Sequence, residues 1–190
     1  LMRPAVVMLL VKASEKAFDQ ARTALLSDDP VQARMWATKA NTHALRARRL
    51  LPTGPFKDRA ERQVQATEVL AGSFDDPAQV LKLAFSRLAE NDVDLVLHTM
   101  DPAAIFRTAF GDRLQELSPE ESKALEEAVV ESCRLAFEKY REAVTTWGSQ
   151  TMNATTQGDR AEISFRYEMI GRKREMTFWM RKTGGIWRIE

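Results

Sequence analysis

The sequence contains few of the residues from which metal sites and catalytic centres are commonly built. It has one cysteine, Cys133, and two histidines, His43 and His98. A lone cysteine cannot form an intramolecular disulfide, and neither histidine has a carboxylate or thiolate at the spacing of a metal site. No glycine-rich phosphate loop and no nucleophile-elbow motif is present. We therefore predict no metal, no cofactor and no catalytic residues, and a protein that is not an enzyme.

Long apolar runs and concentrated charge are also missing. After Arg3 about eight apolar residues stand in a row, too few to cross a bilayer, so we predict no transmembrane segment. This opening is typical either of a signal-peptide remnant or of the first turns of a helix that continues through residues 12–26. The lack of a clean small-residue cleavage site favours the helix. Residues 1–72 carry twelve basic and seven acidic residues, a surplus too dilute to indicate a nucleic-acid partner.

The best-marked element of the sequence is a helix over residues 118–147. Ser118 is a typical N-cap, Pro119 suits the first helical position, and Glu121 completes a capping box. Apolar residues then recur three or four positions apart, which predicts one amphipathic helix. This stripe consists of Leu125, Val129, Cys133, Ala136, Tyr140 and Val144, and is widened by Phe137 and Trp147. Because Cys133 lies in the stripe, we interpret it as a small apolar residue rather than a nucleophile.

Residues 1–72 are predicted to form a helical N-terminal region. The Asp28-Asp29-Pro30 break separates apolar helical patterns over 12–26 and 31–51, which predicts an antiparallel hairpin. The second pattern is rich in alanine, so we expect the two helices to approach closely. A third helix is expected over 56–70, and the turn-forming stretch 71–77 is the predicted boundary to a second domain, 77–190. One role expected for these helices is to bind a protein partner.

The second domain, residues 77–190, is predicted to be of the α+β class. Short helices are expected from Pro77, over 93–99 and over 103–117, followed by the long helix. After Gly148 the apolar period changes from 3.6 to 2, which predicts four strands, over 150–156, 161–169, 175–181 and 186–190. We expect a curved antiparallel sheet with one apolar face, covered by the long helix.

Methionine and aromatic residues are frequent in the predicted strands and in the helices before them. Flexible thioethers adapt to variable apolar ligands, although ordinary core packing explains any one of these residues equally well. We predict a ligand cavity between the long helix and the sheet. Its expected lining is Phe106, Phe110, Phe137, Tyr140, Val144, Phe165, Tyr167, Met169, Met176, Phe178 and Met180.

An isomerase is the third hypothesis, after apolar-ligand binding and a scaffolding module with a solid core. A sheet that curves around a helix can enclose an acid–base pocket, which needs an aspartate in an apolar cavity and an oxyanion donor. The candidates are Asp92, Asp94, Asp101 and Tyr140. Asp92 and Asp101 also stand where helix caps are expected, so their presence has a purely structural explanation.

Four segments of the second domain together suggest a family. They are MDPAAIFRTAFGDRLQELSPEESKALEEAV from Met100, FEKYREAV from Phe137, WGSQTM from Trp147 and RKTGGIWRIE from Arg181. With these segments, residues 77–190 resemble the MlaC or toluene-tolerance family of periplasmic phospholipid-binding proteins, and more loosely the cystatin-like and nuclear-transport-factor-2-like folds. The resemblance implies a phospholipid or other apolar ligand, a role in a lipid-transport assembly, and a periplasmic or otherwise extracytoplasmic location.

Overall fold

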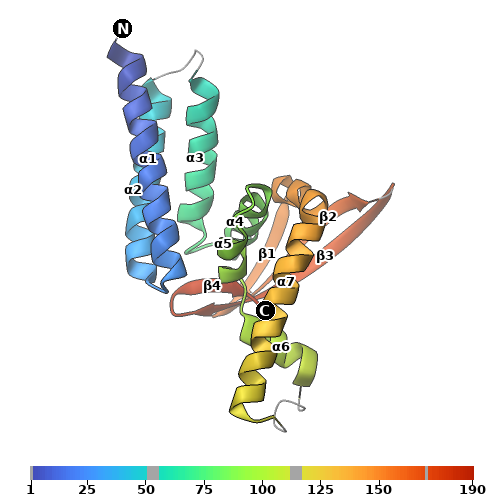
Figure 1. Ribbon diagram of the computed structural model, residues 1–190. Coiled ribbons are helices and arrows are strands. Elements are labelled where there is room, and N and C mark those ends of the chain that lie inside the picture. Colours follow the sequence, from blue (N-terminus) through green and yellow to red (C-terminus); the bar gives the residue numbers. More distant parts are fainter. Residues whose placement is uncertain (1, 51–55, 112–116, 170) are drawn as a thin grey trace.

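The computed structural model describes residues 2–50, 56–111, 117–169 and 171–190, with the side chains of residues 2, 3, 109, 140, 143–145 and 169 left out. The predicted α+β class is confirmed: a helical hairpin is followed by further helices and a four-stranded antiparallel sheet (Figure 1). The sequence Pro52-Thr53-Gly54-Pro55, which predicts a break between the second and third helices, lies outside the described residues.

Three helices form the N-terminal layer: α1 (Met2–Leu26), α2 (Pro30–Leu50) and α3 (Lys57–Gly72). The opening apolar run belongs to α1, as predicted. Five alanines of α2 are fully buried, and this row of small side chains lets the backbones of α1 and α2 approach closely. The buried Ser14 hydroxyl of α1 donates a hydrogen bond of 2.8 Å to the carbonyl oxygen of Ala40. The predicted hairpin is therefore confirmed.

Three short helices follow: α4 (Pro77–Ala89), α5 (Val93–His98) and α6 (Pro102–Phe110). Each begins after an aspartate whose carboxylate accepts a backbone N–H of the first turn, and these caps are Asp76, Asp92 and Asp101. Helix α6 ends before Gly111, whose φ of 54° lies in the left-handed region that stops a helix. The prediction of a helix to residue 117 was therefore too long, and residues 112–116 lie outside the described part.

The long helix is α7 (Pro119–Thr145), and a short 3-10 helix, η2 (Thr146–Ser149), follows it. Both hydrogen bonds of the predicted capping box are present. The Glu121 N–H donates to the Ser118 hydroxyl over 3.2 Å, and the Ser118 N–H donates to the Glu121 carboxylate over 2.9 Å. This reciprocal pair fixes where α7 begins.

The sheet is an antiparallel meander in the order β1 (Met152–Gln157), β2 (Arg160–Met169), β3 (Arg172–Thr183) and β4 (Ile186–Ile189). Its register pairs Ala161 with Met180, Ile163 with Phe178, and Phe165 with Met176. These pairs share one face because opposite residues of neighbouring strands point to the same side. The alternating pattern of the sequence therefore predicted the apolar face correctly.

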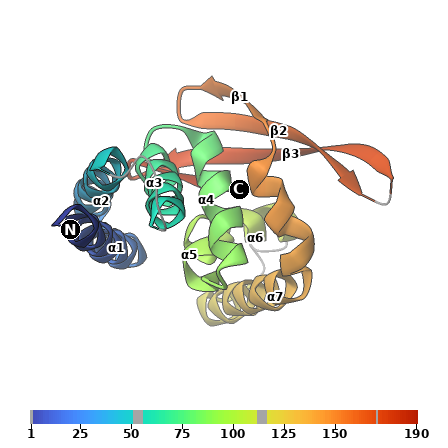
Figure 2. The same cartoon turned by 90° about the horizontal axis from the view of Figure 1, so that it is seen from above.

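The helix that packs on this apolar face is α4, and α7 packs on α4, α5 and α6 (Figures 1 and 2). The expectation that the long helix covers the sheet was thus wrong in its choice of helix. Nine of the thirteen residues of α4 are buried, whereas the described side chains of α7 are half-buried or exposed. Because α4 is apolar on nearly all sides, it fits between two layers, and the one-sided stripe of α7 suits an outer position.

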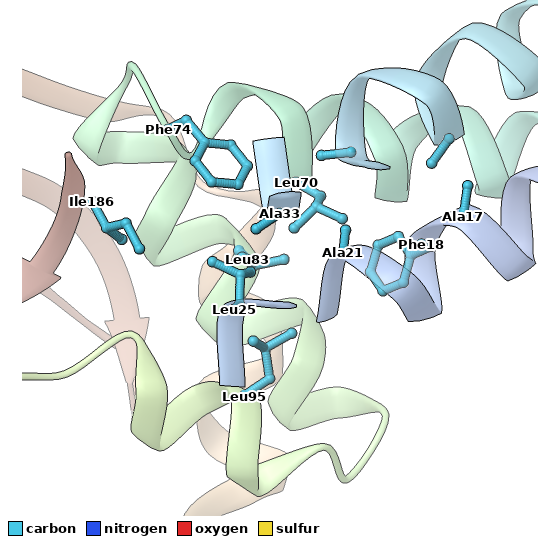
Figure 3. Close-up of a cluster of buried hydrophobic side chains, with 12 residues drawn as sticks. Ala17, Phe18, Ala21, Leu25, Ala33, Leu70, Phe74, Leu83, Leu95 and Ile186 are labelled. Atoms are coloured by element: carbon cyan, nitrogen blue, oxygen red, sulfur yellow. The ribbon is translucent and has the colours of Figure 1, made fainter. Parts of the chain in front are cut away.

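One buried cluster joins the N-terminal helices to the rest of the chain. Leu25 of α1 and Leu70 of α3 meet Leu83 of α4, Leu95 of α5 and Ile186 of β4 (Figure 3). The boundary expected at residues 71–77 therefore runs through a shared core. The division into two domains remains a prediction.

Candidate functional site

An apolar pocket of about 240 Å³ lies where α4, α5, α7, η2 and the sheet meet. Helix α4 forms one wall and strands β3 and β4 contribute another, while α5, α7 and η2 supply further residues, and the pocket is partly enclosed. The lining residues are Ala84, Phe85, Leu88, Val96, Met100, Phe137, Trp147, Phe178 and Ile189. None of these carries an ionisable side chain, so the pocket offers its occupant almost only hydrocarbon and aromatic surface.

Phe85 of α4 organises the aromatic part of the pocket. Its ring meets the rings of Trp147, Phe165 and Phe178 edge-on, at centroid distances of 5.7, 6.0 and 6.1 Å. Edge-to-face pairs at such distances are favourable beyond the area they bury. Trp147 also lies 5.0 Å from the ring of Tyr167. These contacts link α4, η2 and the sheet, and they hold the pocket walls in place.

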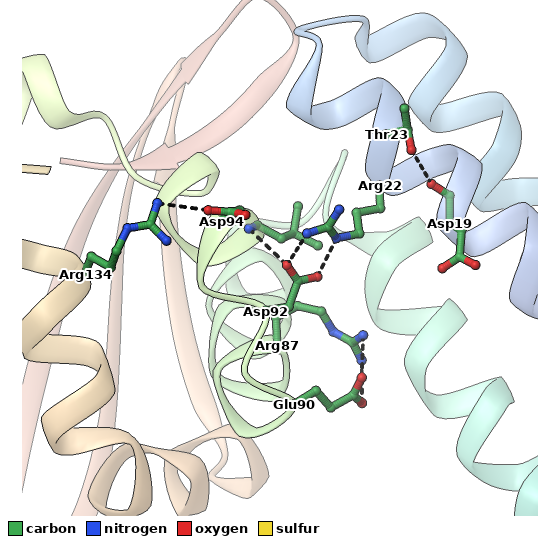
Figure 4. Close-up of polar contacts among 9 residues, drawn as sticks. Asp19, Arg22, Thr23, Arg87, Glu90, Asp92, Asp94 and Arg134 are labelled. Carbon is green, nitrogen blue, oxygen red and sulfur yellow. Dashed lines mark hydrogen bonds and ion pairs between the residues drawn. The ribbon is translucent and has the colours of Figure 1, made fainter. Parts of the chain in front are cut away.

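Phe137 is the residue that α7 contributes to the pocket. It packs against Ala84, Leu88 and Val96, which belong to α4 and α5. One helical turn on either side, α7 makes polar contacts with the segment that opens α5. Arg134 pairs with Asp94 over 2.9 Å, and Arg141 donates to the Asn91 side chain over 3.0 Å (Figure 4 shows the former). These contacts fix the position of α7 relative to α5 and thereby the place on α4 against which Phe137 packs.

The structure distributes the predicted lining residues over three environments. Phe137 and Phe178 line the pocket, whereas the neighbouring apolar cluster contains Phe165, Tyr167, Met176 and Met180. Phe106 and Phe110 pack on one another along α6, with ring centroids 5.1 Å apart, and are not among the lining residues. The side chains of Tyr140, Val144 and Met169 lie outside the described part.

Seven of the nine lining residues were not predicted from the sequence, and three of these seven belong to α4. The seven are Ala84, Phe85, Leu88, Val96, Met100, Trp147 and Ile189. The run of apolar residues in α4 signalled that this helix is buried on several sides, and that signal was sufficient to include Phe85 and Leu88. No sequence feature indicates that Ala84 or Met100 faces a cavity.

The three carboxylates considered for isomerase chemistry are held by structural contacts. Asp92 accepts two hydrogen bonds from Arg22, of 2.7 and 2.6 Å, and also caps α5 (Figure 4). Asp94 pairs with Arg134, and Asp101 caps α6. Burial alone would raise the pKa of Asp92, but the hydrogen bonds and charge of Arg22 hold that pKa below its ordinary value. None of the three carboxylates lines the apolar pocket.

Metal and thiol chemistry have no support among the described residues. These residues contain no group of three or more His, Cys, Asp and Glu side chains placed to hold a metal ion. Cys133 is half-buried on α7, and burial raises the pKa of its thiol, which disfavours the reactive thiolate. The helices of the described part also include none with the length and apolarity needed to cross a membrane.

Two larger grooves lie on the surface of the N-terminal helices. A groove of about 750 Å³ between α1, α3 and the end of α4 is lined by four arginines and four acidic residues, and ion pairs such as Arg59–Glu15 and Arg22–Asp92 cross it. The other groove, of about 540 Å³, lies beside the first turns of α2 and is more apolar, with Val31 and Met35 exposed at its edge.

Comparison with protein-family models, with curated proteins and with solved structures gives no match for this chain. The resemblance to the MlaC family therefore remains a prediction from sequence.

Proposed function

We propose that this protein binds a small apolar molecule, or the hydrocarbon chain of a lipid, in the pocket between α4, α7 and the sheet. The observation that carries this proposal is a partly enclosed space of about 240 Å³ bounded by apolar and aromatic side chains from six helical or strand elements and by Met100. Native interiors are close-packed, and a void of this size is uncommon where no ligand binds.

The size of the pocket narrows the class of ligand. It exceeds the cavity of roughly 150 Å³ that accommodates benzene, and it falls just below the range of roughly 300–1,000 Å³ typical of drug-sized ligands. A pocket of 240 Å³ suits one hydrocarbon chain or one small ring system. A phospholipid would be held through one chain, with its headgroup outside. The proposed place in an extracytoplasmic lipid-transport assembly is supported only by the sequence resemblance.

Binding without catalysis is the activity that the pocket chemistry favours. General acid–base and nucleophilic catalysis need an ionisable or nucleophilic side chain in reach of the ligand. The nine lining residues supply none. The aromatic rings of Phe85, Phe137 and Phe178 instead provide broad apolar contact, which selects for hydrocarbon and tolerates variation in its shape.

A fluorescence titration with N-phenyl-1-naphthylamine, a neutral apolar fluorophore, tests the proposal. We expect saturable enhancement at one site per chain and displacement of the fluorophore by free fatty acids. Ala84→Leu fills the pocket and should weaken binding at least tenfold, which corresponds to about 1.4 kcal/mol. Leu135→Ala is the matched control, because Leu135 is on α7 but 58% exposed and outside the lining.

Mass spectrometry of an organic extract of the gently purified protein gives an independent measurement. A stoichiometric lipid in the wild-type extract, reduced in the Ala84→Leu extract, supports the proposal. An empty extract together with an Ala84→Leu variant that binds the fluorophore as tightly as wild type would contradict it.

A second candidate function is docking of a protein partner on the N-terminal helices. The observation that favours it is the apolar groove beside α2, where Val31 is 75% and Met35 49% exposed. Contiguous exposed apolar surface of this kind is typical of interaction sites. Affinity isolation from the native host should then recover a partner with the wild-type protein and lose it with a Val31→Ser, Met35→Ser double variant. Recovery of the same partner by both proteins would place its binding site elsewhere.

A further inference from the structure

The two edges of the sheet are treated differently by the rest of the chain. Beside β4, the chain runs parallel to Ile189, whose N–H donates to the Thr99 carbonyl over 2.8 Å and whose carbonyl accepts the Asp101 N–H over 2.7 Å. Strand β1 pairs with β2 on one side, and in the described part of the chain no segment pairs with its other side. Figure 2 shows β1 along the outer margin of the sheet.

The open edge lacks most of the devices by which proteins prevent strand pairing. Edge strands are commonly protected by lysine, proline, a bulge or a covering loop. The sequence of β1, MNATTQ, has no charged residue, no proline and no glycine, and five of its six residues are exposed. Its six residues pair regularly with β2, without a bulge. The outer backbone N–H and C=O groups of β1 are thus presented to an additional strand.

The register of β1 restricts how a second copy of the same strand can pair with it. Met152, Ala154 and Thr156 lie opposite Phe165, Ile163 and Ala161 of β2, and so belong to the apolar face of the sheet. Opposite residues in an antiparallel pair share a face, so two copies must align residues of the same face. A two-fold axis through Ala154 does this.

We propose that two copies of this protein associate through antiparallel pairing of their β1 strands, with Ala154 opposite Ala154 of the second copy. Met152 then lies opposite Thr156, and Asn153 opposite Thr155. This pairing joins the two sheets into one of eight strands with a continuous apolar face. Because the two-fold axis makes the two β1 strands equivalent, each copy uses its open edge once and the assembly closes at two copies.

The second copy is favoured as occupant because β1 is uncharged and has a small residue, Ala154, at its centre, so that two copies can pair without charge repulsion or crowding. Within residues 148–160 the charged residues are Asp159 and Arg160, and this register places them opposite Ser149 and Gly148 of the other copy. No like charges face one another, and the alanine pair on the axis leaves room for the flanking methionine and threonine side chains. A contact limited to one six-residue strand is small, so we expect a reversible, concentration-dependent dimer.

Sedimentation velocity over a concentration series tests the association, with charged variants of Ala154. Ala154 is exposed, so neither variant disturbs the core. Ala154→Lys and Ala154→Glu each place two like charges opposite one another, and each should weaken dimerisation at least tenfold. An equimolar mixture of the two places lysine opposite glutamate and should restore the dimer. Thr183→Lys, at the exposed end of β3, is the control and should leave association unchanged.

Disulfide trapping tests the register. In a Cys133→Ala background, Ala154→Cys should form a covalent dimer under mild oxidation, while Thr155→Cys, opposite Asn153 of the other copy, should do so much less. A wild-type protein that stays monomeric at all concentrations would overturn the proposal. A dimer that Ala154→Lys leaves intact would overturn it as well, since association would then use another surface, such as the groove beside α2.

Discussion

Replacement of Ala84 by leucine is expected to stabilise the protein, because this residue lines the apolar pocket and is 3% exposed. Leucine adds three carbon groups, and at about 0.8 kcal/mol for each buried group the gain is about 2.4 kcal/mol. Fixing the leucine rotamer costs about 0.5–1 kcal/mol. The pocket volume of about 240 Å³ leaves ample space for the added atoms. We therefore expect the free energy of unfolding to rise by about 1.5–2 kcal/mol.

Urea denaturation followed by tryptophan fluorescence measures this change, and thermal denaturation gives a second reading. For a chain of 190 residues, a change of 1 kcal/mol moves the melting temperature by about 2–4 °C, so we expect an increase of about 3–8 °C. Both measurements use ligand-free protein, because a ligand bound to wild type alone would offset the gain.

Ala37→Leu is the matched control for this prediction. Ala37 is a helical, fully buried alanine like Ala84, but it lies in the core between α1 and α2 and lines no described pocket. Leucine should overpack that contact and lower the free energy of unfolding by about 1–3 kcal/mol. If Ala84→Leu destabilised the protein as much as Ala37→Leu does, the pocket would not be free space, and the proposal of an apolar ligand would fail.

Three other predictions concern polar contacts that hold the helices in place. Asp92→Asn should lower the free energy of unfolding by about 1–2 kcal/mol at neutral pH, since Arg22 loses its charged partner but the α5 cap is kept. Because the pKa of Asp92 is lowered in the folded state, this loss should begin to shrink as pH falls below about 4, the ordinary pKa of aspartate, and should vanish once pH is below the folded-state pKa, as pH-dependent urea denaturation can show. Ser118→Ala should cost about 1 kcal/mol through the α7 cap, measured by the same method, and an equal loss in Ser118→Asn would contradict a capping role. Ser14→Ala should cost about 1 kcal/mol by removing the buried bond to Ala40, and no change in urea midpoint would refute this.

The parts of the fold that depend on neighbouring residues were predictable from the sequence. Asp76, Asp101 and Ser118 mark helix starts in the sequence, because a capping side chain accepts a hydrogen bond from a backbone N–H within the next three residues. The sheet register likewise follows from alternation and short glycine turns, such as Gly158 with its φ of 64°. Each of these signals depends on a few neighbouring residues, so no knowledge of tertiary packing is needed to interpret it.

The assignment of helices to layers was not predictable in the same way. An amphipathic stripe shows that one face of a helix is buried, but not which element buries it. The stripe of α7 was therefore paired with the sheet, whereas α4 occupies that place. The ion pair between Arg22 and Asp92 joins residues 70 positions apart, and no local sequence pattern indicates that either residue is the partner of the other. Which helix packs on the sheet, and which distant residues form an ion pair, is determined only by the packing of the complete chain.

The pocket itself follows from this arrangement of layers. Helix α4 lies on the sheet and fills the space beneath it with large side chains, among them the fully buried Leu81. Helix α7 is held farther out, on α4 and α5, by polar contacts of Arg134 and Arg141 with the turn that opens α5. Among the described side chains of α7 and η2, Phe137 and Trp147 line the space between these two helices and α4, where they face the small Ala84. Because polar contacts at its margin hold α7 away from the sheet, a gap remains beside the small Ala84 that a larger side chain would have filled. This gap is the space that we assign to the ligand.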